Sequence, residues 1–217
     1  MREIWLIRHG ESESNADDSV PTTTTAGTGL TSTGFRQATA IATAFPRPPA
    51  LIVTSPYLRS QQTARPTLAR FGQARAEEWP VYEFSCFSLA RRYNTNGRQR
   101  APFWEAFWER CDPEYCDGEG AESFAMLIAR AAETLDRLRH LEDDFAAIFS
   151  HGLFMRTLLW VGIIASAESD AASMRRFRDF KASFRIPNGA ILKVYVTFEQ
   201  ELLFSRFSTA HLPAHLI

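Results

Sequence analysis

Three short runs of apolar residues lie along the chain, and polar residues follow each of them directly. The runs cover residues 3–7, 51–53 and 145–149. Runs of this length, bounded by turn residues, predict strands that are buried on both faces, as in a parallel sheet covered by helices. Two later runs, 190–196 and 202–207, predict a hairpin or an edge pair. The pattern therefore favours a mostly parallel sheet.

The segments between the predicted strands have helical periodicity. Thr31 is a plausible N-cap for a helix that ends at the prolines of 46–49. A long amphipathic helix is expected over 122–141, and the apolar stretch 153–165 predicts a buried helix that is too short to span a bilayer. Further expected elements are a helix after Pro56 that is disturbed at Pro66, a strand at 81–83, a short helix at 102–108 and a polar helix at 168–179.

Basic side chains stand where the predicted strands end. Arg8 and His9 follow the first strand, Arg59 comes shortly after the second, and His151 follows the third. In open α/β sheets, ligands bind beyond the carboxyl ends of the strands, so these side chains are expected to converge. Two guanidinium groups and two imidazoles suit a phosphoryl group. The sequence therefore predicts a phosphate site at this edge of the sheet.

Size and charge restrict the kind of protein further. The chain has 217 residues, 45% of them hydrophobic, and a formal net charge of -1. This is enough to bury the core of one α/β domain, so 1–217 is expected to be a single domain with an irregular insertion, or lid, at about 84–118 over the strand ends. The balanced charge provides no field for nucleic acid or an anionic membrane, and neither is expected as a partner.

Cysteines and histidines outside the strand ends give little sign of other chemistry. Three cysteines without paired spacing argue against disulfides or a zinc site, and the first strand leaves no room for a secretory signal. A cytoplasmic location with reduced thiols is therefore expected. His211 and His215 have the spacing of a metal pair on a helix, but Pro213 between them argues against one. We expect no metal and no cofactor.

Several motifs occur in a fixed order from one end of the chain to the other. They are Arg8-His9-Gly10-Glu11-Ser12 with Asn15, Leu30-Thr31 with Gly34, Gln37 and Ala38, Ser55-Pro56 with Arg59, Gln62, Thr63 and Ala64, Glu122-Ser123, Ser150-His151-Gly152 and Asn188-Gly189-Ala190. In this order the chain resembles the histidine phosphatase superfamily, branch 1, whose members include cofactor-dependent phosphoglycerate mutases. The resemblance implies a three-layer α/β/α sandwich and a phosphohistidine intermediate.

The resemblance also implies roles for individual residues. His9 would be the nucleophile, and an ordinary imidazole pKa of about 6.5 makes its neutral form available near pH 7. Arg8, Arg59 and His151 would hold the transferred phosphoryl group, with Asn15 as an auxiliary contact. We expect a histidine acid phosphatase-like hydrolase that acts on a small phosphorylated substrate or on a phosphoprotein.

A proton donor for the leaving alcohol is also needed. In the branch nearest to the mutases this donor is a glutamate that resembles Glu83, although the residues after Glu83 depart from the mutase pattern. Glu11 is a competing carboxylate, which in the family motif is usually structural. Glu83 is therefore the expected acid.

Other functions remain open at this stage. Phosphoglycerate mutase-type transfer is one alternative, and a non-catalytic module that binds phosphorylated ligands is another. The insertion contains Arg91, Arg92, Arg98 and Arg100, which could set specificity but lack the mutase spacing. Its aromatic group, Phe103, Trp104, Phe107 and Trp108, could line a substrate pocket or, as we favour, dock on the core or on a second subunit. The oligomeric state is open, and a dimer is possible.

Overall fold

A six-stranded sheet forms the centre of the protein. The computed structural model describes residues 1–19, 21, 26–164 and 166–217. Its strands are β1 (Arg2–Arg8), β2 (Leu51–Thr54), β3 (Arg75–Glu78), β4 (Phe145–Ser150), β5 (Ile191–Val196) and β6 (Leu202–Ser208). They are arranged in the order β3-β2-β4-β1-β5-β6. The first four of these strands pair in parallel, and β5 and β6 add an antiparallel pair at one edge, so the predicted mostly parallel sheet is confirmed.

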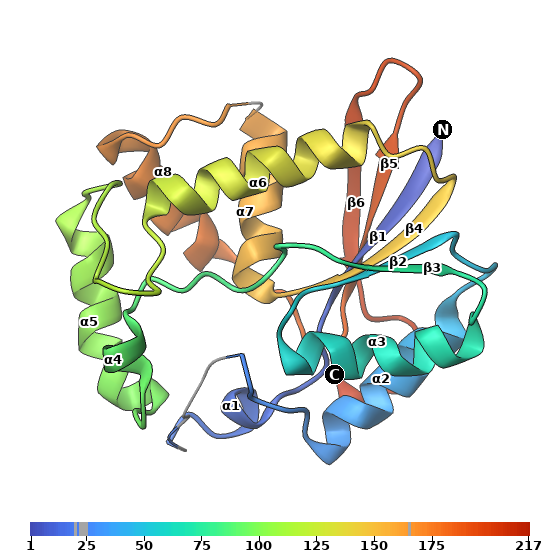
Figure 1. The fold of residues 1–217 in the computed structure, drawn as a ribbon, viewed down its shortest axis with the longest axis horizontal. Helices are drawn as coiled ribbons and strands as arrows, with labels where there is room; N and C mark the ends of the chain where they lie inside the picture. The colour runs from blue at the N-terminus through green and yellow to red at the C-terminus, as the bar shows by residue number, and fades with distance from the viewer. Residues whose placement is uncertain (20, 22–25, 165) are drawn as a thin grey trace.

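Helices cover both faces of this sheet, as Figure 1 shows. The helices are α1 (Glu13–Ala16), α2 (Ser32–Ala44), α3 (Leu58–Arg70), α4 (Leu89–Arg92), α5 (Gly97–Arg110), α6 (Phe124–Arg139), α7 (Gly152–Ile164), α8 (Ala171–Ser183) and a 3-10 turn, η1 (Ala214–Leu216). Helices α2 and α3 pack on one face, and α6 and α7 on the other (Figure 1). This is the three-layer α/β/α arrangement that was expected.

The alternation of side chains along β1 explains the two-sided core. Ile4 and Leu6 belong to the cluster beneath α6 and α7, whereas Trp5 and Ile7 belong to the cluster beneath α2. Successive side chains of a strand point to opposite faces, so a continuous apolar run supplies both layers at once. Burying such side chains contributes about 1.5–3 kcal/mol each relative to leaving them exposed.

One helix start confirms the predicted cap at Thr31, and a second helix has a cap of the same kind at Ser123. The Thr31 side chain accepts a hydrogen bond from the Gly34 amide at 3.1 Å and begins α2. Ser123 caps α6 in the same way through the Met126 amide at 3.2 Å. Each cap satisfies a backbone donor that the helix itself cannot satisfy.

The predicted strand at 81–83 is wrong. The observed edge strand is β3, which pairs with β2 from Leu51 and Arg75 onward, and most of its side chains are exposed. A charged edge strand protects the sheet against pairing with another chain, and for that reason it lacks the apolar run that marks a central strand. Residues 81–83 leave the sheet beyond β3, where the Val81 carbonyl accepts a hydrogen bond from the Ser150 hydroxyl at 2.7 Å.

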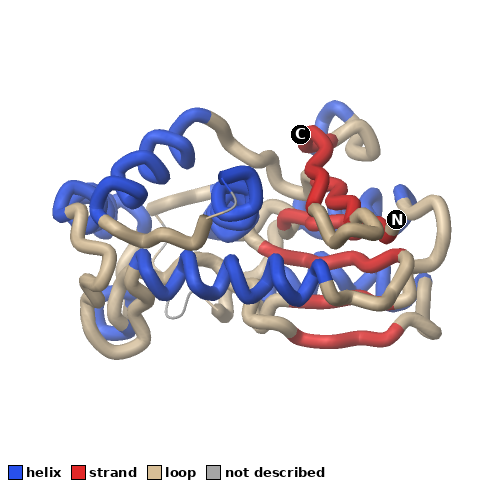
Figure 2. Tube along the Cα trace, turned by 90° about the horizontal axis from the view of Figure 1, so that it is seen from above, coloured by secondary structure: helices blue, strands red, loops and turns tan. Residues whose placement is uncertain are grey.

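The segment 84–118 contains more helix than the sequence pattern indicated. It holds α4 and α5, and α5 begins at Gly97 rather than near 102 because Asn96 caps it. Figure 2 shows the strands gathered at one end of the molecule, with only helices and loops at the other end. There α5 packs against α8, with the rings of Trp108 and Phe177 5.8 Å apart. Within the described residues, no helix has the length and apolar character needed to cross a membrane.

Candidate active site

The two histidines meet at the carboxyl ends of β1 and β4. These strands are parallel neighbours, with Arg8 opposite Ser150, so His9 and His151 follow in register. Their ring centroids are 5.1 Å apart, and His9 is 3% and His151 0% exposed. The predicted convergence of the strand ends is therefore present in the structure.

His9 is held in one orientation by two contacts. Its Nδ1 lies 2.6 Å from the Gly10 carbonyl, and the Arg59 Nε donates to its Nε2 at 3.2 Å. Because a carbonyl only accepts, Nδ1 must carry the proton, which leaves a lone pair on Nε2. Burial, followed by the charges of Arg59 and Arg8, holds the pKa of His9 well below its usual value. The ring is therefore neutral at pH 7, with Nε2 free to act as a nucleophile.

Gly10 has a steric reason to be a glycine. A Cβ at this position would lie 2.6 Å from the Gly34 carbonyl oxygen at the start of α2, which is far inside contact distance. The loop after β1 can therefore approach α2 only without a side chain. This close approach positions the Gly10 carbonyl beside His9.

His151 and Arg8 each have a buried nitrogen without a hydrogen-bond partner among the described residues. His151 bonds through Nε2 to the Ser55 hydroxyl at 2.8 Å, which leaves Nδ1 unsatisfied. Arg8 donates through Nη1 to the Ile186 carbonyl, and its Nε is unsatisfied. Buried polar atoms are normally paired, so these two nitrogens are suited to bind an oxyanion.

Arg59 adds a second guanidinium group from the first turn of α3. Its side chain is 4% exposed, and burial lowers its pKa. A cation at a helix N-terminus is disfavoured by the helix dipole by some tenths of a kcal/mol, and a bound anion reverses that penalty. Burial, with a smaller contribution from neighbouring arginines, also lowers the pKa of Arg8 to about 10.

Glu83 lies at the N-terminus of α7, across from the histidines. Its carboxylate accepts hydrogen bonds from the Leu153 and Phe154 amides and from its own neighbour Phe84, each at 3.1 Å. Glu83 and Arg8 line the same cavity. The sequence assignment therefore brings a carboxylate to the site, although residues 81–83 are not a strand.

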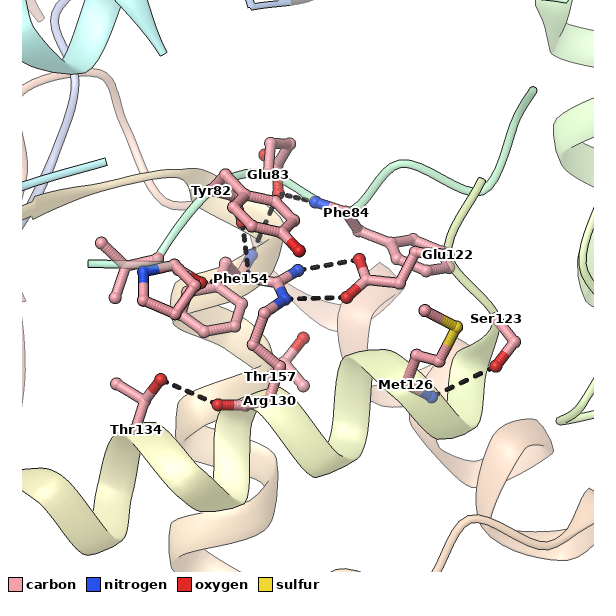
Figure 3. A network of polar contacts seen from close by, with 12 residues as sticks. Tyr82, Glu83, Phe84, Glu122, Ser123, Met126, Arg130, Thr134, Phe154 and Thr157 are labelled. Carbon is pink, nitrogen blue, oxygen red and sulfur yellow. Dashed lines mark hydrogen bonds and ion pairs between the residues drawn. The ribbon is translucent and has the colours of Figure 1, made fainter. Parts of the chain in front are cut away.

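A buried ion pair holds the segment that carries Glu83 (Figure 3). Arg130 of α6 binds Glu122 through two hydrogen bonds of 2.7 and 2.8 Å and donates to the carbonyls of Pro80 and Tyr82, both at 2.9 Å. The guanidinium also lies over the Tyr82 ring, 3.9 Å from its centroid. Nη1 of Arg130 thus holds residues 80–82, while Nε and Nη2 bind the Glu122 carboxylate. This gives the Glu122-Ser123 motif a structural role next to the site.

Asn15 and Glu11 have different surroundings. Asn15 Oδ1 accepts from Asn188 Nδ2 at 2.9 Å, and the same Asn188 amide reaches the His9 carbonyl at 3.2 Å. Asn15 therefore lies at the cavity wall. Glu11 instead accepts from the Thr31 hydroxyl at 2.6 Å, which ties the loop after β1 to the start of α2. This contact gives Glu11 a structural role.

The cavity beside these residues has a volume of about 580 Å³ and is rich in cations. Four basic side chains line it, against one carboxylate, Glu83. They are Arg8, Arg156, Lys181 and Arg185. None of the last three was predicted as a site residue. Lys181 and Arg185 lie at the end of α8 and just beyond it and follow no strand, and Arg156 lies within the apolar stretch that forms α7.

The arginines of the insertion do not line this cavity. Arg91 pairs with Asp117 at 2.8 Å, and Arg98 pairs with Asp18 at 2.9 Å. Arg92 donates to the Ser85 hydroxyl, and Arg100 donates to the Thr95 carbonyl. The aromatic group is divided, since Phe107 and Trp108 are buried in the core, Trp104 lines the cavity and Phe103 is 47% exposed.

Possible metal ligands do not gather in the part of the chain that the structure describes. No group there of three or more His, Cys, Asp or Glu side chains is placed to hold a metal ion. His211 bonds through Nε2 to the Gly189 carbonyl at 3.0 Å, and His215 lies in the η1 turn.

The arrangement of paired histidines and arginines at the ends of parallel strands defines a phosphoryl-binding α/β protein. The model of the histidine phosphatase superfamily (branch 1) matches residues 4–186, and the chain belongs to this superfamily. The resemblance inferred from the motifs is thereby confirmed. No curated protein matches the chain.

Three solved structures share the fold of this chain at low sequence identity. The phosphoserine phosphatase of Entamoeba histolytica, as an H9A mutant with phosphoserine, superposes with a TM-score of 0.72 at 20% identity, covering 98% of this chain and 100% of that one. The alpha-ribazole phosphatase of Shigella flexneri gives 0.70 at 23%, covering 96% of each chain. The mycobacterial glucosyl-3-phosphoglycerate phosphatase gives 0.68 at 19%, covering 95% and 97%. These comparisons confirm the fold.

Proposed function

We propose that the protein is a phosphomonoester hydrolase that works through a phosphohistidine intermediate on His9. The observation that carries this proposal is the position of His9 Nε2, which is unprotonated, buried and 3.2 Å from the Arg59 Nε. A nucleophile in contact with a guanidinium donor is suited to attack a phosphoryl group that the same donor binds.

In the first step, the phosphoryl oxygens accept hydrogen bonds from Arg8, Arg59 and His151, and Asn15 is a further contact at the cavity wall. His9 Nε2 forms a bond to phosphorus while the bond from phosphorus to the ester oxygen breaks. Glu83 gives a proton to the leaving oxygen. The Gly10 carbonyl accepts from Nδ1 and stabilises the positive charge that attack places on the ring.

In the second step, water attacks phosphorus and the bond to Nε2 breaks. The Glu83 carboxylate now takes a proton from this water, so that the acid and the neutral histidine are both regenerated and inorganic phosphate leaves. The amides of Leu153 and Phe154 support the carboxylate form that this step requires. No cofactor or metal ion enters either step.

Hydrolysis is favoured over the two alternatives. A mutase must keep water away from its phosphoenzyme, and the insertion arginines that could close over a phosphoglycerate are engaged elsewhere, for example Arg91 with Asp117. A non-catalytic module is disfavoured because both histidines and both arginines are present, with Arg59 in contact with His9. We take 1–217 to be one domain, with 84–118 as its lid and Trp104 as the contribution of that lid to the cavity.

The substrate is proposed to be a small phosphorylated molecule. The cavity of about 580 Å³ matches the size of small-molecule sites, and distant relatives with this fold are described with phosphoserine and 3-phosphoglyceric acid. A phosphoprotein remains the second candidate. A cytoplasmic location and an acid phosphatase-like specificity belong to the same proposal.

The test compares the wild type with His9→Ala on p-nitrophenyl phosphate, phosphoserine and sugar phosphates. The variant should lose phosphate release on the order of 10⁴-fold or more, because it lacks the nucleophile. His140→Ala, an exposed histidine on the far end of α6, is the matched control. Acid-labile labelled phosphate should appear on the wild type only. Retained turnover in His9→Ala would contradict the mechanism, and isomerisation of phosphoglycerate without release would indicate a mutase.

A further inference from the structure

The C-terminal end of α8 brings two cations to the cavity that Arg8 and Glu83 also line. Lys181 lies in the last turn of the helix and Arg185 just beyond it, and both line the cavity. The ion pairs found among the described residues include neither of them, whereas Arg178 on the same helix pairs with Asp179. The charge of both side chains is therefore available to a ligand.

This end of α8 is anchored and does not depend on the ligand for its position. Arg156 of α7 donates to the Lys181 carbonyl and, at 3.3 Å, to the Phe184 carbonyl, which holds the turn after the helix. The Lys181 ammonium lies over the rings of Trp108 and Trp104, 4.4 and 5.1 Å from their centroids. A preorganised cation loses little freedom when it binds an anion.

A phosphomonoester with no other charged group offers no anion to Lys181 and Arg185. The phosphoryl dianion carries two charges, which Arg8 and Arg59 balance at the histidine end. Arg156, Lys181 and Arg185 then remain, against the single carboxylate of Glu83. Burial, followed by the charges of Arg156 and Arg178, lowers the pKa of Lys181 to about 8, so a nearby anion would stabilise its charged form.

We infer that the substrate carries a second anionic group on its alcohol part, and that Lys181 and Arg185 bind this group. The inference rests on the proposed phosphatase function and deepens it by naming a substrate class. A carboxylate and a second phosphate both satisfy the same chemistry. Trp104 forms the neighbouring wall, against which the carbon skeleton between the two anions packs.

Binding to His9→Ala protein separates this inference from the proposed function, because it needs no turnover. Calorimetry compares phosphoserine with phosphoethanolamine, which differ only in the carboxylate, and propane-1,3-diol bisphosphate with propyl phosphate, which differ in the second phosphate. The ligand with the second anion should bind about 10-fold to 100-fold more tightly, as charged hydrogen bonds do. The pair with the larger ratio identifies the anion.

The double variant Lys181→Gln/Arg185→Gln, in the same background, should remove this preference and leave the affinity for phosphoethanolamine and propyl phosphate within about threefold. Arg175→Gln, an exposed arginine on α8 outside the cavity, is the matched control and should keep the preference. In turnover by the otherwise wild-type enzyme, the double variant should raise KM for the two-anion ester with little change in kcat.

Measuring the preference for the two-anion ligand at several pH values tests the same contact independently. Lys181 loses its proton as the pH rises through about 8, so the preference should fall between pH 7 and pH 9 in the Arg185→Gln background. The charged groups that act on Lys181 are Arg156, Arg178, Cys86 and Asp179.

Equal binding of the matched ligands, or a preference that survives the double variant, would overturn the second-anion site and leave the phosphatase proposal standing. Failure of every phosphomonoester to bind His9→Ala protein would overturn both.

Discussion

The proposed site has two ends that are built differently, the histidine cluster at the strand ends and the cations at the end of α8. At the histidine end, each group follows a strand of the sheet and has a partner that fixes it, as Arg59 fixes His9 and Ser55 fixes His151. At the opposite end, Lys181 and Arg185 stand at a helix terminus that α7 and the insertion hold in place. In the proposed function, the sheet positions the groups for chemistry that any phosphate ester needs, whereas helix packing positions the groups that we infer to select among esters.

The largest effect is expected for Arg59→Gln, a change at the histidine end of the site. This change removes a donor that contacts both His9 and the bound phosphoryl group, so kcat/KM should fall about 10²–10³-fold on every ester tested. Steady-state kinetics on p-nitrophenyl phosphate and phosphoserine measure this loss. Arg65→Gln, an exposed position one and a half turns further along α3, is the control and should be unchanged.

A loss confined to phosphoserine would contradict this role for Arg59. Arg59 would then belong with the groups that select the substrate, and the proposed division between a chemical end and a selecting end of the site would be lost.

Glu83→Gln should lower kcat by different amounts for esters with different leaving groups. An alkyl alcohol needs a proton when it leaves, whereas p-nitrophenolate scarcely does. We therefore expect a loss of about 10²-fold in kcat for phosphoserine and only a few-fold for p-nitrophenyl phosphate. The ratio of the two kcat values, measured for wild type and variant at several pH values, checks the assignment.

Equal losses on both esters would remove Glu83 as the acid. Arg130→Met refines the same measurement, because Arg130 holds the carbonyls of Pro80 and Tyr82 next to Glu83. Misplacing the acid should shift the leaving-group ratio in the same direction, by about tenfold or less. A loss of folded protein alone would lower both rates equally and leave this ratio unchanged.

The histidine end was predictable because its signals are local. An apolar run followed by Arg8 and His9 specifies both a buried strand and the groups at its end, and parallel pairing then brings His151 to the same place. The same rule failed for β3, whose residues Arg75 to Glu78 carry no apolar run because they form a charged edge.

No comparable signal in the sequence predicts the cations at the opposite end of the site. Lys181 and Arg185 belong to a polar helix and the residues after it, and nothing in its periodicity distinguishes them from solvated surface residues. Their place in the cavity depends on the contact of α7 with the end of α8 through Arg156. Contacts between distant elements are set by tertiary packing, which a pattern along one chain does not encode.

The smallest effect is expected for a change in the insertion. This change tests whether the insertion selects the substrate. The sequence analysis considered its arginines for that role, but Arg98 is 72% exposed and pairs with Asp18 away from the cavity. An exposed ion pair contributes little, so Arg98→Gln should leave kcat and KM within about twofold for phosphoserine and p-nitrophenyl phosphate alike. A KM for phosphoserine raised about fivefold or more, with p-nitrophenyl phosphate unchanged, would return substrate selection to the insertion, since only a ligand that reaches Arg98 could produce that difference.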